Sequence, residues 1–229
     1  MYKTLKKTAL LAGIAALLFS LAACSGLKTG LDVVANEAKT SFAALLDAAP
    51  SAVSENEQYK GAALTAPDSS IKFIWSRDWS KSPQFDALLE FDAQPFLDAG
   101  LDPAKLPGYF IYQNGMLSVG RELGDVRAED ELSAKGAFEE IVNQKRDLIG
   151  YHSQMDHYGI DLDNGNMFEW AKDMGANDKD MVFVLNPEPF IEAGVDPNAV
   201  EGWVFDKVTV GMGADEKQVD KFLKPFNLK

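Results

Sequence analysis

The chain has 229 residues, with 35 Asp and Glu against 22 Lys and Arg, so its net charge at neutral pH is −13. A surface this acidic repels phosphate backbones and anionic lipid headgroups, which argues against nucleic-acid binding. Cys24 is the only cysteine, so a disulfide within the molecule and a cysteine-ligated metal site are excluded.

The first 23 residues have the three parts of a secretory signal peptide. Lysines at positions 3, 6 and 7 supply its positive charge, an apolar run extends from Thr8 to Leu21, and small residues precede Cys24. This order predicts a cleaved targeting segment (residues 1–23) and not a membrane-spanning helix of the folded protein.

The run Leu21-Ala22-Ala23-Cys24 resembles the lipobox of bacterial lipoproteins. The resemblance implies a diacylglyceryl thioether on Cys24 and an acylated amino terminus, and several acyl chains hold a protein on a membrane durably. Ser25 after the cysteine implies the outer membrane of a bacterium that has one, and otherwise the outer face of the cytoplasmic membrane. Residues 24–30 would form a short polar tether. The alternative is a lone buried cysteine after an ordinary signal peptide.

The stretch at positions 95–108 returns at positions 189–202, which indicates a tandem duplication into repeat 1 (31–124) and repeat 2 (125–229). Proline begins a helix well, glycine ends one, and an Asp before proline caps the next, so each copy predicts two clipped helical turns. We assign these residues a structural role at a corner: Pro95, Phe96, Gly100, Asp102 and Pro103, and in the second copy Pro189, Phe190, Gly194, Asp196 and Pro197.

In repeat 1, apolar residues at three- and four-residue spacing predict a helix from Leu31 to Pro50. The apolar runs at 64–66 and 71–75 predict a hairpin, and 86–91 a third strand. After the corner, Asn114-Gly115 predicts a tight turn between strands at 109–112 and 116–119.

Repeat 2 follows the same order. We expect a helix from about Glu129 to Ile149, a hairpin around Asn164-Gly165, a third strand at 181–185, a last pair of strands at 203–205 and 208–210, and a closing helix over 215–226. Each repeat would thus contain a helix, three strands, the corner and two strands. This predicts an α+β fold built from two tandem repeats, each a helix plus an antiparallel sheet.

The run from residue 151 to residue 166 contains both histidines of the protein and several carboxylates. Imidazole and carboxylate groups suit Zn, Fe or Mn, so His152, Asp156, His157 and Asp161 are the candidate metal ligands. The alternative is a pair of surface histidines on a solvated loop.

Two tryptophans are candidate ligand-binding residues together with His152 and His157. Trp79 lies in a polar stretch and has no aromatic counterpart in the second repeat, and Trp203 directly follows the second copy of the corner. An exposed tryptophan can anchor a ligand or a protein partner, although partial burial is the alternative.

No motif of nucleotide binding, nucleophilic catalysis or haem attachment occurs in the chain, and no cofactor is expected. We therefore expect a lipid-anchored, extracytoplasmic, non-catalytic protein that binds a small molecule or an envelope protein in a groove between the repeats. The alternatives are an envelope enzyme or metal protein that uses His152 and His157, and a structural or assembly lipoprotein. The sequence favours a binding protein over an enzyme without naming the ligand.

Overall fold

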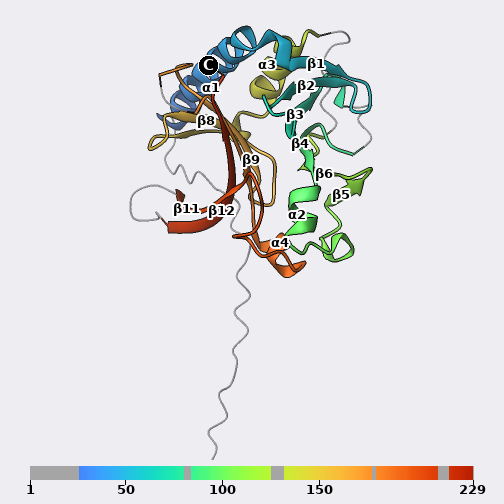
Figure 1. Cartoon of the computed structure of the whole chain (residues 1–229). Helices are drawn as coiled ribbons and strands as arrows, with labels where there is room; N and C mark the ends of the chain where they lie inside the picture. The colour runs from blue at the N-terminus through green and yellow to red at the C-terminus, as the bar shows by residue number, and fades with distance from the viewer. Residues whose placement is uncertain (1–25, 80–83, 125–131, 177–178, 211–216, 229) are drawn as a thin grey trace, which may run out of the picture.

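The computed structural model describes residues 26–79, 84–124, 132–176, 179–210 and 217–228 (Figure 1). The expected signal peptide and the lipidation site at Cys24 lie outside these residues. Within them, no helix combines the length and the apolar character needed to cross a membrane.

Two six-stranded antiparallel sheets form the body of the molecule. The first sheet has the order β1-β2-β3-β4-β6-β5, and the second, read from β7, has the equivalent order β7-β8-β9-β10-β12-β11. The strands of the first sheet are β1 (Val53–Asn56), β2 (Gly61–Thr65), β3 (Ile71–Ser76), β4 (Ala87–Asp92), β5 (Phe110–Gln113) and β6 (Met116–Arg121). Those of the second are β7 (Ile149–His152), β8 (His157–Asp161), β9 (Met167–Ala171), β10 (Met181–Leu185), β11 (Val204–Val210) and β12 (Lys217–Phe226).

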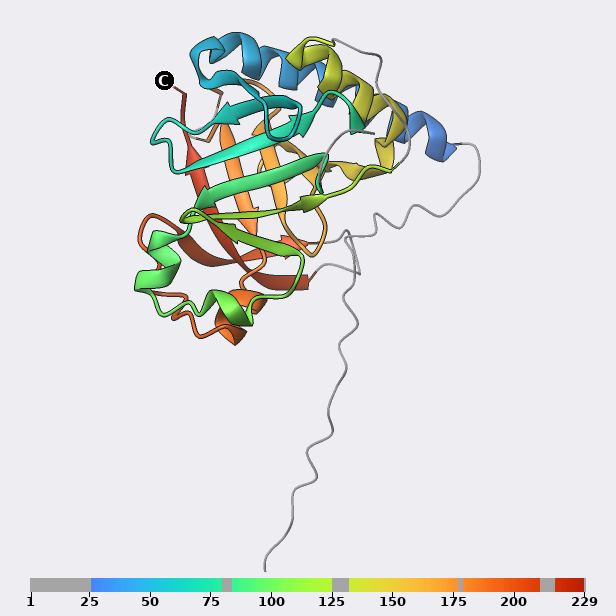
Figure 2. The same ribbon diagram turned by 90° about the vertical axis from the view of Figure 1, so that its right-hand side faces the viewer.

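Four α-helices accompany the sheets within the described residues: α1 (Gly26–Ala48), α2 (Gln94–Asp98), α3 (Ala134–Gln144) and α4 (Glu188–Glu192). The long helices α1 and α3 lie side by side at one end of the molecule, and the short helices α2 and α4 lie at the other end (Figures 1 and 2). The prediction of an α+β fold with two sheet-containing repeats is confirmed.

The two long helices are exchanged between the repeats. The strands against which α1 packs most are β7 and β9 of the second sheet, whereas α3 packs on β2 and β3 of the first. Indole hydrogen bonds fix this exchange: Trp75 Nε1 donates to the carbonyl of Ala134 at 2.8 Å, and Trp170 Nε1 donates to Ser41 Oγ at 2.8 Å. Each repeat therefore completes the core of the other.

Equivalent aromatic residues of the two repeats meet in pairs at the centre of the molecule. The rings of Phe42 and Phe138 stack with centroids 3.6 Å apart, and those of Phe73 and Phe168 stack at 4.7 Å. Contacts between equivalent residues are the signature of a two-fold axis, as in a symmetric dimer. The fold is thus a pseudo-dimer within one chain, with one continuous core that includes both sheets.

The repeated corner lies on the same pseudo-two-fold axis. The backbone N–H of Asp102 donates to the carbonyl of Ala193 at 3.0 Å, and the N–H of Asp196 donates to that of Ala99 at 2.9 Å. Gly100 and Gly194 have φ of +104° and +106°, a backbone conformation that favours glycine. The backbones of the two residues also approach each other closely.

The other residues to which we assigned a structural role occupy the places that their types predict. Pro95 and Pro189 stand at the starts of α2 and α4. The carboxylate of Asp102 accepts a hydrogen bond from the N–H of Ala104, and that of Asp196 accepts one from the N–H of Asn198. Pro103 begins a 3₁₀ turn, Pro197 has the equivalent place in the second corner, and the rings of Phe96 and Phe190 pack at 4.6 Å.

The predicted tight turns are confirmed. Asn114 and Gly115 have φ of +54° and +79° between β5 and β6, and Asn164 and Gly165 have φ of +52° and +79° between β8 and β9. Positive φ at both central residues gives a hairpin turn whose twist matches the strands.

The predicted closing helix over 215–226 is wrong, because residues 217–226 form strand β12. Val219, Phe222, Leu223 and Phe226 have helical spacing, but Pro225 would break a helix. In the strand, Pro225 lies opposite Val182 of β10. The pairing of β12 with β11 ends at Leu223, opposite Val204. Pro225 therefore has no strand partner on the β11 side that would need its missing N–H. The segments 203–205 and 208–210 were expected to be two strands that pair with each other. They form one strand instead, β11, because its partner is β12.

Each repeat also has a strand that the sequence did not predict. β1 and β7 are edge strands of four residues, so each repeat has four strands before its corner. The helix expected to end at Ile149 ends at Gln144, begins after the N-cap Ser133, and gives way to β7. Helix α1 begins at Gly26, so residues 26–30 of the expected tether are helical.

Candidate functional site

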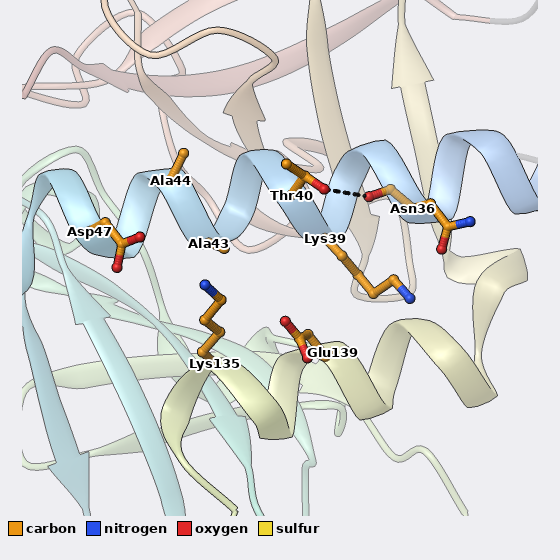
Figure 3. Close-up of a pocket in the computed structure, with 8 residues that line it drawn as sticks. All are labelled: Asn36, Lys39, Thr40, Ala43, Ala44, Asp47, Lys135 and Glu139. Carbon is orange, nitrogen blue, oxygen red and sulfur yellow. Dashed lines mark hydrogen bonds between the residues drawn. The ribbon is translucent and has the colours of Figure 1, made fainter.

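A groove between α1 and α3 is the candidate site in the described part of the chain (Figure 3). It is an open groove of about 550 Å³, a volume within the range of small-molecule sites. Because each repeat supplies one helix, the groove is built by both repeats. Its lining residues are Asn36, Lys39, Thr40, Ala43, Ala44 and Asp47 from α1, and Lys135 and Glu139 from α3.

Helical periodicity separates the groove from the core. On α1, Lys39, Ala43 and Asp47 recur every four residues on one side, while Phe42 is buried and stacks on Phe138. Alanine at position 43 leaves open space between the helices where a longer side chain would fill it. The aromatic stack fixes the two walls relative to each other.

The charges of the groove are mostly unpaired. Lys39 Nζ donates to Asn143 Oδ1 at 2.7 Å. The side chains of Lys135, Asp47 and Glu139 make no hydrogen bond or ion pair with any residue that the structure describes. Three ionic groups in one groove are therefore available to a ligand.

The pseudo-two-fold symmetry shows how the two halves of the groove differ. The sequence offset that relates Phe42 to Phe138 relates three further pairs across the groove: Lys39 and Lys135, Ala43 and Glu139, and Asp47 and Asn143. Lysine is thus kept in both halves. The carboxylate of Glu139 has no counterpart on α1, and the amide of Asn143 replaces the carboxylate of Asp47.

Both histidines lie on strands and not on a solvated loop. His152 ends β7 and His157 begins β8, opposite each other in the ladder. His157 is 1% exposed, and its Nε2 lies 2.7 Å from the carbonyl oxygen of Lys179. His152 Nδ1 lies 3.0 Å from Glu169 Oε1, and this carboxylate raises the pKa of His152, although burial opposes it.

The structure does not gather the predicted metal ligands. Asp156 accepts a hydrogen bond from Tyr151 Oη at 2.6 Å, and Asp161 lies 3.7 Å from an Arg121 nitrogen. His152 and His157 each face a different partner. Among the residues of known placement, no group of three or more His, Cys, Asp or Glu side chains is arranged to hold a metal ion.

Two buried charged residues of the second sheet, Glu169 and Lys221, were not singled out by the sequence. Glu169 lies between Phe168 and Trp170 on β9, so its side chain points to the outer face of the second sheet, yet it is 2% exposed. Lys221 Nζ donates to the carbonyl of Gly165 at 2.6 Å, and burial lowers the pKa of Lys221 to about 8. Burial likewise raises the pKa of Asp161.

Alignment of the two repeats distinguishes Glu169 from its neighbours in the sequence. Phe73-Ile74-Trp75 in the first repeat corresponds to Phe168-Glu169-Trp170 in the second. A carboxylate thus replaces an isoleucine at a buried position, which is costly unless the charge has partners.

The two candidate tryptophans, Trp79 and Trp203, do not share a binding surface. Trp79 is 4% exposed within the hydrophobic core. Trp203 is half-buried at the corner, where its ring packs on Phe96 at 5.4 Å and under Lys224 Nζ at 5.6 Å.

Comparison of the chain with protein-family models, with curated proteins and with solved structures found no significant match in any of the three.

Proposed function

We propose that the protein is a lipid-anchored, extracytoplasmic, non-catalytic binding protein whose ligand occupies the groove between α1 and α3. The observation that carries this proposal is the groove itself, in which Lys135, Asp47 and Glu139 have no partner among the described residues. Unpaired charges in a concave site are the groups that orient a polar ligand.

The position of the groove in the fold supports this proposal. Its walls are the two exchanged helices, which are held by the Phe42–Phe138 stack and by the Lys39–Asn143 hydrogen bond. A preorganised site loses little conformational entropy when it binds. Helix α1 also follows Cys24 closely in the chain, so a lipid on Cys24 would hold the groove near the membrane.

Native mass spectrometry tests the binding function. Residues 25–229 would be purified without chelator, as wild type and as Lys135→Ala. We expect the wild type to carry an added small mass that the variant lacks, while Lys105→Ala, an exposed lysine at the corner, keeps it. A bare chain that also gains no mass from a cell extract would contradict the proposal and favour a structural or assembly role.

Anchoring is tested separately. The lipobox resemblance leads us to expect that Cys24→Ser moves the protein from the membrane fraction to the soluble extracytoplasmic fraction. Fractionation and metabolic labelling with palmitate measure this change. Retention of Cys24→Ser in the membrane fraction would contradict lipid anchoring.

A second candidate function is general-base catalysis at His152. The observation that favours it is the contact of Nδ1 with the buried Glu169, while the side chain stays 27% exposed. A carboxylate that holds one imidazole nitrogen leaves the other free to take a proton from water or substrate. If Glu169→Gln and His152→Asn hydrolyse a panel of nitrophenyl esters as fast as wild type does, this function is excluded.

A further inference from the structure

We propose that the groove between α1 and α3 binds a small zwitterion of the amino-acid class, with its carboxylate at Lys135 and its ammonium group at Glu139 and Asp47. This inference rests on the proposed binding function and adds the chemistry of the ligand. It is carried by the order of the charges along the groove, by the difference between its two halves and by the geometry of α3.

The signs of the charges alternate along the groove. Figure 3 shows the charged side chains in the order Asp47, Lys135, Glu139 and Lys39, so carboxylate and ammonium groups alternate along the groove. A dianion placed at Lys135 would meet Asp47 and Glu139, and a dication would meet the two lysines. A ligand that carries one charge of each sign avoids both repulsions.

The two halves of the groove show where the ligand fits. In one half, Lys39 Nζ donates a hydrogen bond to Asn143 Oδ1 at 2.7 Å. The equivalent pair in the other half is Lys135 and Asp47, which carry opposite charges and would attract each other more strongly, yet no ion pair joins them. The open pair leaves room for a ligand that bridges the two groups.

The geometry of α3 keeps Lys135 and Glu139 available. The two residues are one helical turn apart, but a lysine that precedes a glutamate by four residues makes the weaker of the two possible ion pairs. No ion pair forms between them among the described residues. Their side chains therefore present a positive and a negative group at neighbouring points, as the carboxylate and ammonium of an amino acid require.

The test uses the full chain in detergent and isothermal titration calorimetry. The first probe is a pool of the standard amino acids. The second is the pool of their N-acetyl derivatives, which lack the ammonium charge, and the third is the pool of their amides, which lack the carboxylate. We expect binding of the first pool and at least tenfold weaker binding of the other two.

Variants of the groove locate the binding. Glu139→Ala introduces the residue that position 43 already has in the equivalent place, so it preserves the helix, and Lys135→Ala removes the partner of the carboxylate. We expect each to weaken binding of the amino-acid pool by tenfold or more. The matched control, Lys105→Ala, should bind as wild type does. Unchanged binding by Glu139→Ala and Lys135→Ala would overturn the proposal.

The outcomes separate this inference from the function on which it rests. If the wild type carries a native ligand that Lys135→Ala loses, but amino acids bind no better than their singly charged derivatives, the zwitterion is wrong and the groove function stands. If no ligand depends on Lys135, both are wrong.

Discussion

The imidazole of His152 lies beside the carboxylate of Glu169, which raises the pKa of His152 above that of an unfolded histidine. A group whose pKa is higher in the folded state stabilises the fold below the unfolded pKa. This contribution is lost as the pH rises through the folded pKa. The structure therefore predicts a stability that falls with rising pH in the neutral range because of this one residue.

The substitution that tests this effect is His152→Asn, because Asn56 has the equivalent place in the first sheet, opposite Gly61 as His152 is opposite His157. Protonated His152 forms an ion pair with Glu169 at 3.0 Å, and a charge-assisted contact of this kind contributes roughly 1.5–3 kcal/mol. We expect the variant to lose about that much stability at pH 5.5 and much less at pH 8.5, measured by urea denaturation. A loss that is the same at both pH values would show that His152 contributes by packing alone.

Gly194 is one of two residues at the corner, with Gly100, at which a side chain would be costly. Its φ is +106°, and a Cβ would lie 2.9 Å from the carbonyl oxygen of Gly100. Strained backbone conformations cost of order 1–3 kcal/mol, so Gly194→Ala should lose at least about 2 kcal/mol of unfolding free energy.

Gly108→Ala is the matched control for Gly194→Ala, because a Cβ at Gly108 meets nothing within 4 Å. Thermal melts of the two variants compare them directly. Equal melting temperatures would mean that the close approach of the two corners does not constrain the fold.

At the scale of elements, the exchanged helices meet through Phe42 on α1 and Phe138 on α3, both fully buried. Truncation of a buried phenylalanine costs about 3–5 kcal/mol, so Phe42→Ala and Phe138→Ala should each be strongly destabilising. Because each ring is the main neighbour of the other, the double variant should be less destabilised than the sum by about 0.5–1.5 kcal/mol. Chemical denaturation of the four proteins in this cycle measures the coupling, and strict additivity would contradict the stack.

The sequence predicted correctly those turns and caps that depend on the type of one or two neighbouring residues. The turn at Asn114-Gly115 and the capped turn after Asp102 follow from single residue types, and both were found. The segment 217–226 was predicted as a helix because its apolar residues have helical spacing. Its strand conformation depends on pairing with β10 and β11, which the segment itself does not encode.

The candidate site was predictable only in part, for the same reason. A groove between the repeats was expected from the duplication, but its residues were not, because the exchange of α1 and α3 is a property of packing. Lys39 and Lys135 look like ordinary surface lysines in the sequence. His152 was singled out as a metal ligand, whereas the structure places it beside Glu169, which the comparison of Ile74 with Glu169 could have revealed.

At the scale of the whole molecule, the exchange of helices makes the two repeats one folding unit. Trp75 and Trp170 donate hydrogen bonds to residues of the other repeat, and Phe73 stacks on Phe168 between the two sheets. A repeat alone would expose this core to water, and neither sheet would keep the helix that packs on it. We therefore expect a single cooperative unfolding transition for the intact protein.

Cutting the chain between the repeats tests this expectation. A protease site introduced within residues 125–131 would separate the halves covalently without touching the described core. We expect the halves to stay together in gel filtration and to unfold together, because the shared core and the corner hydrogen bonds of Asp102 and Asp196 are intact. Each half expressed alone should lack a cooperative transition by circular dichroism. Two halves that separate after cleavage and melt independently would show that each repeat is a domain in its own right, and that the pseudo-dimer is not required for folding.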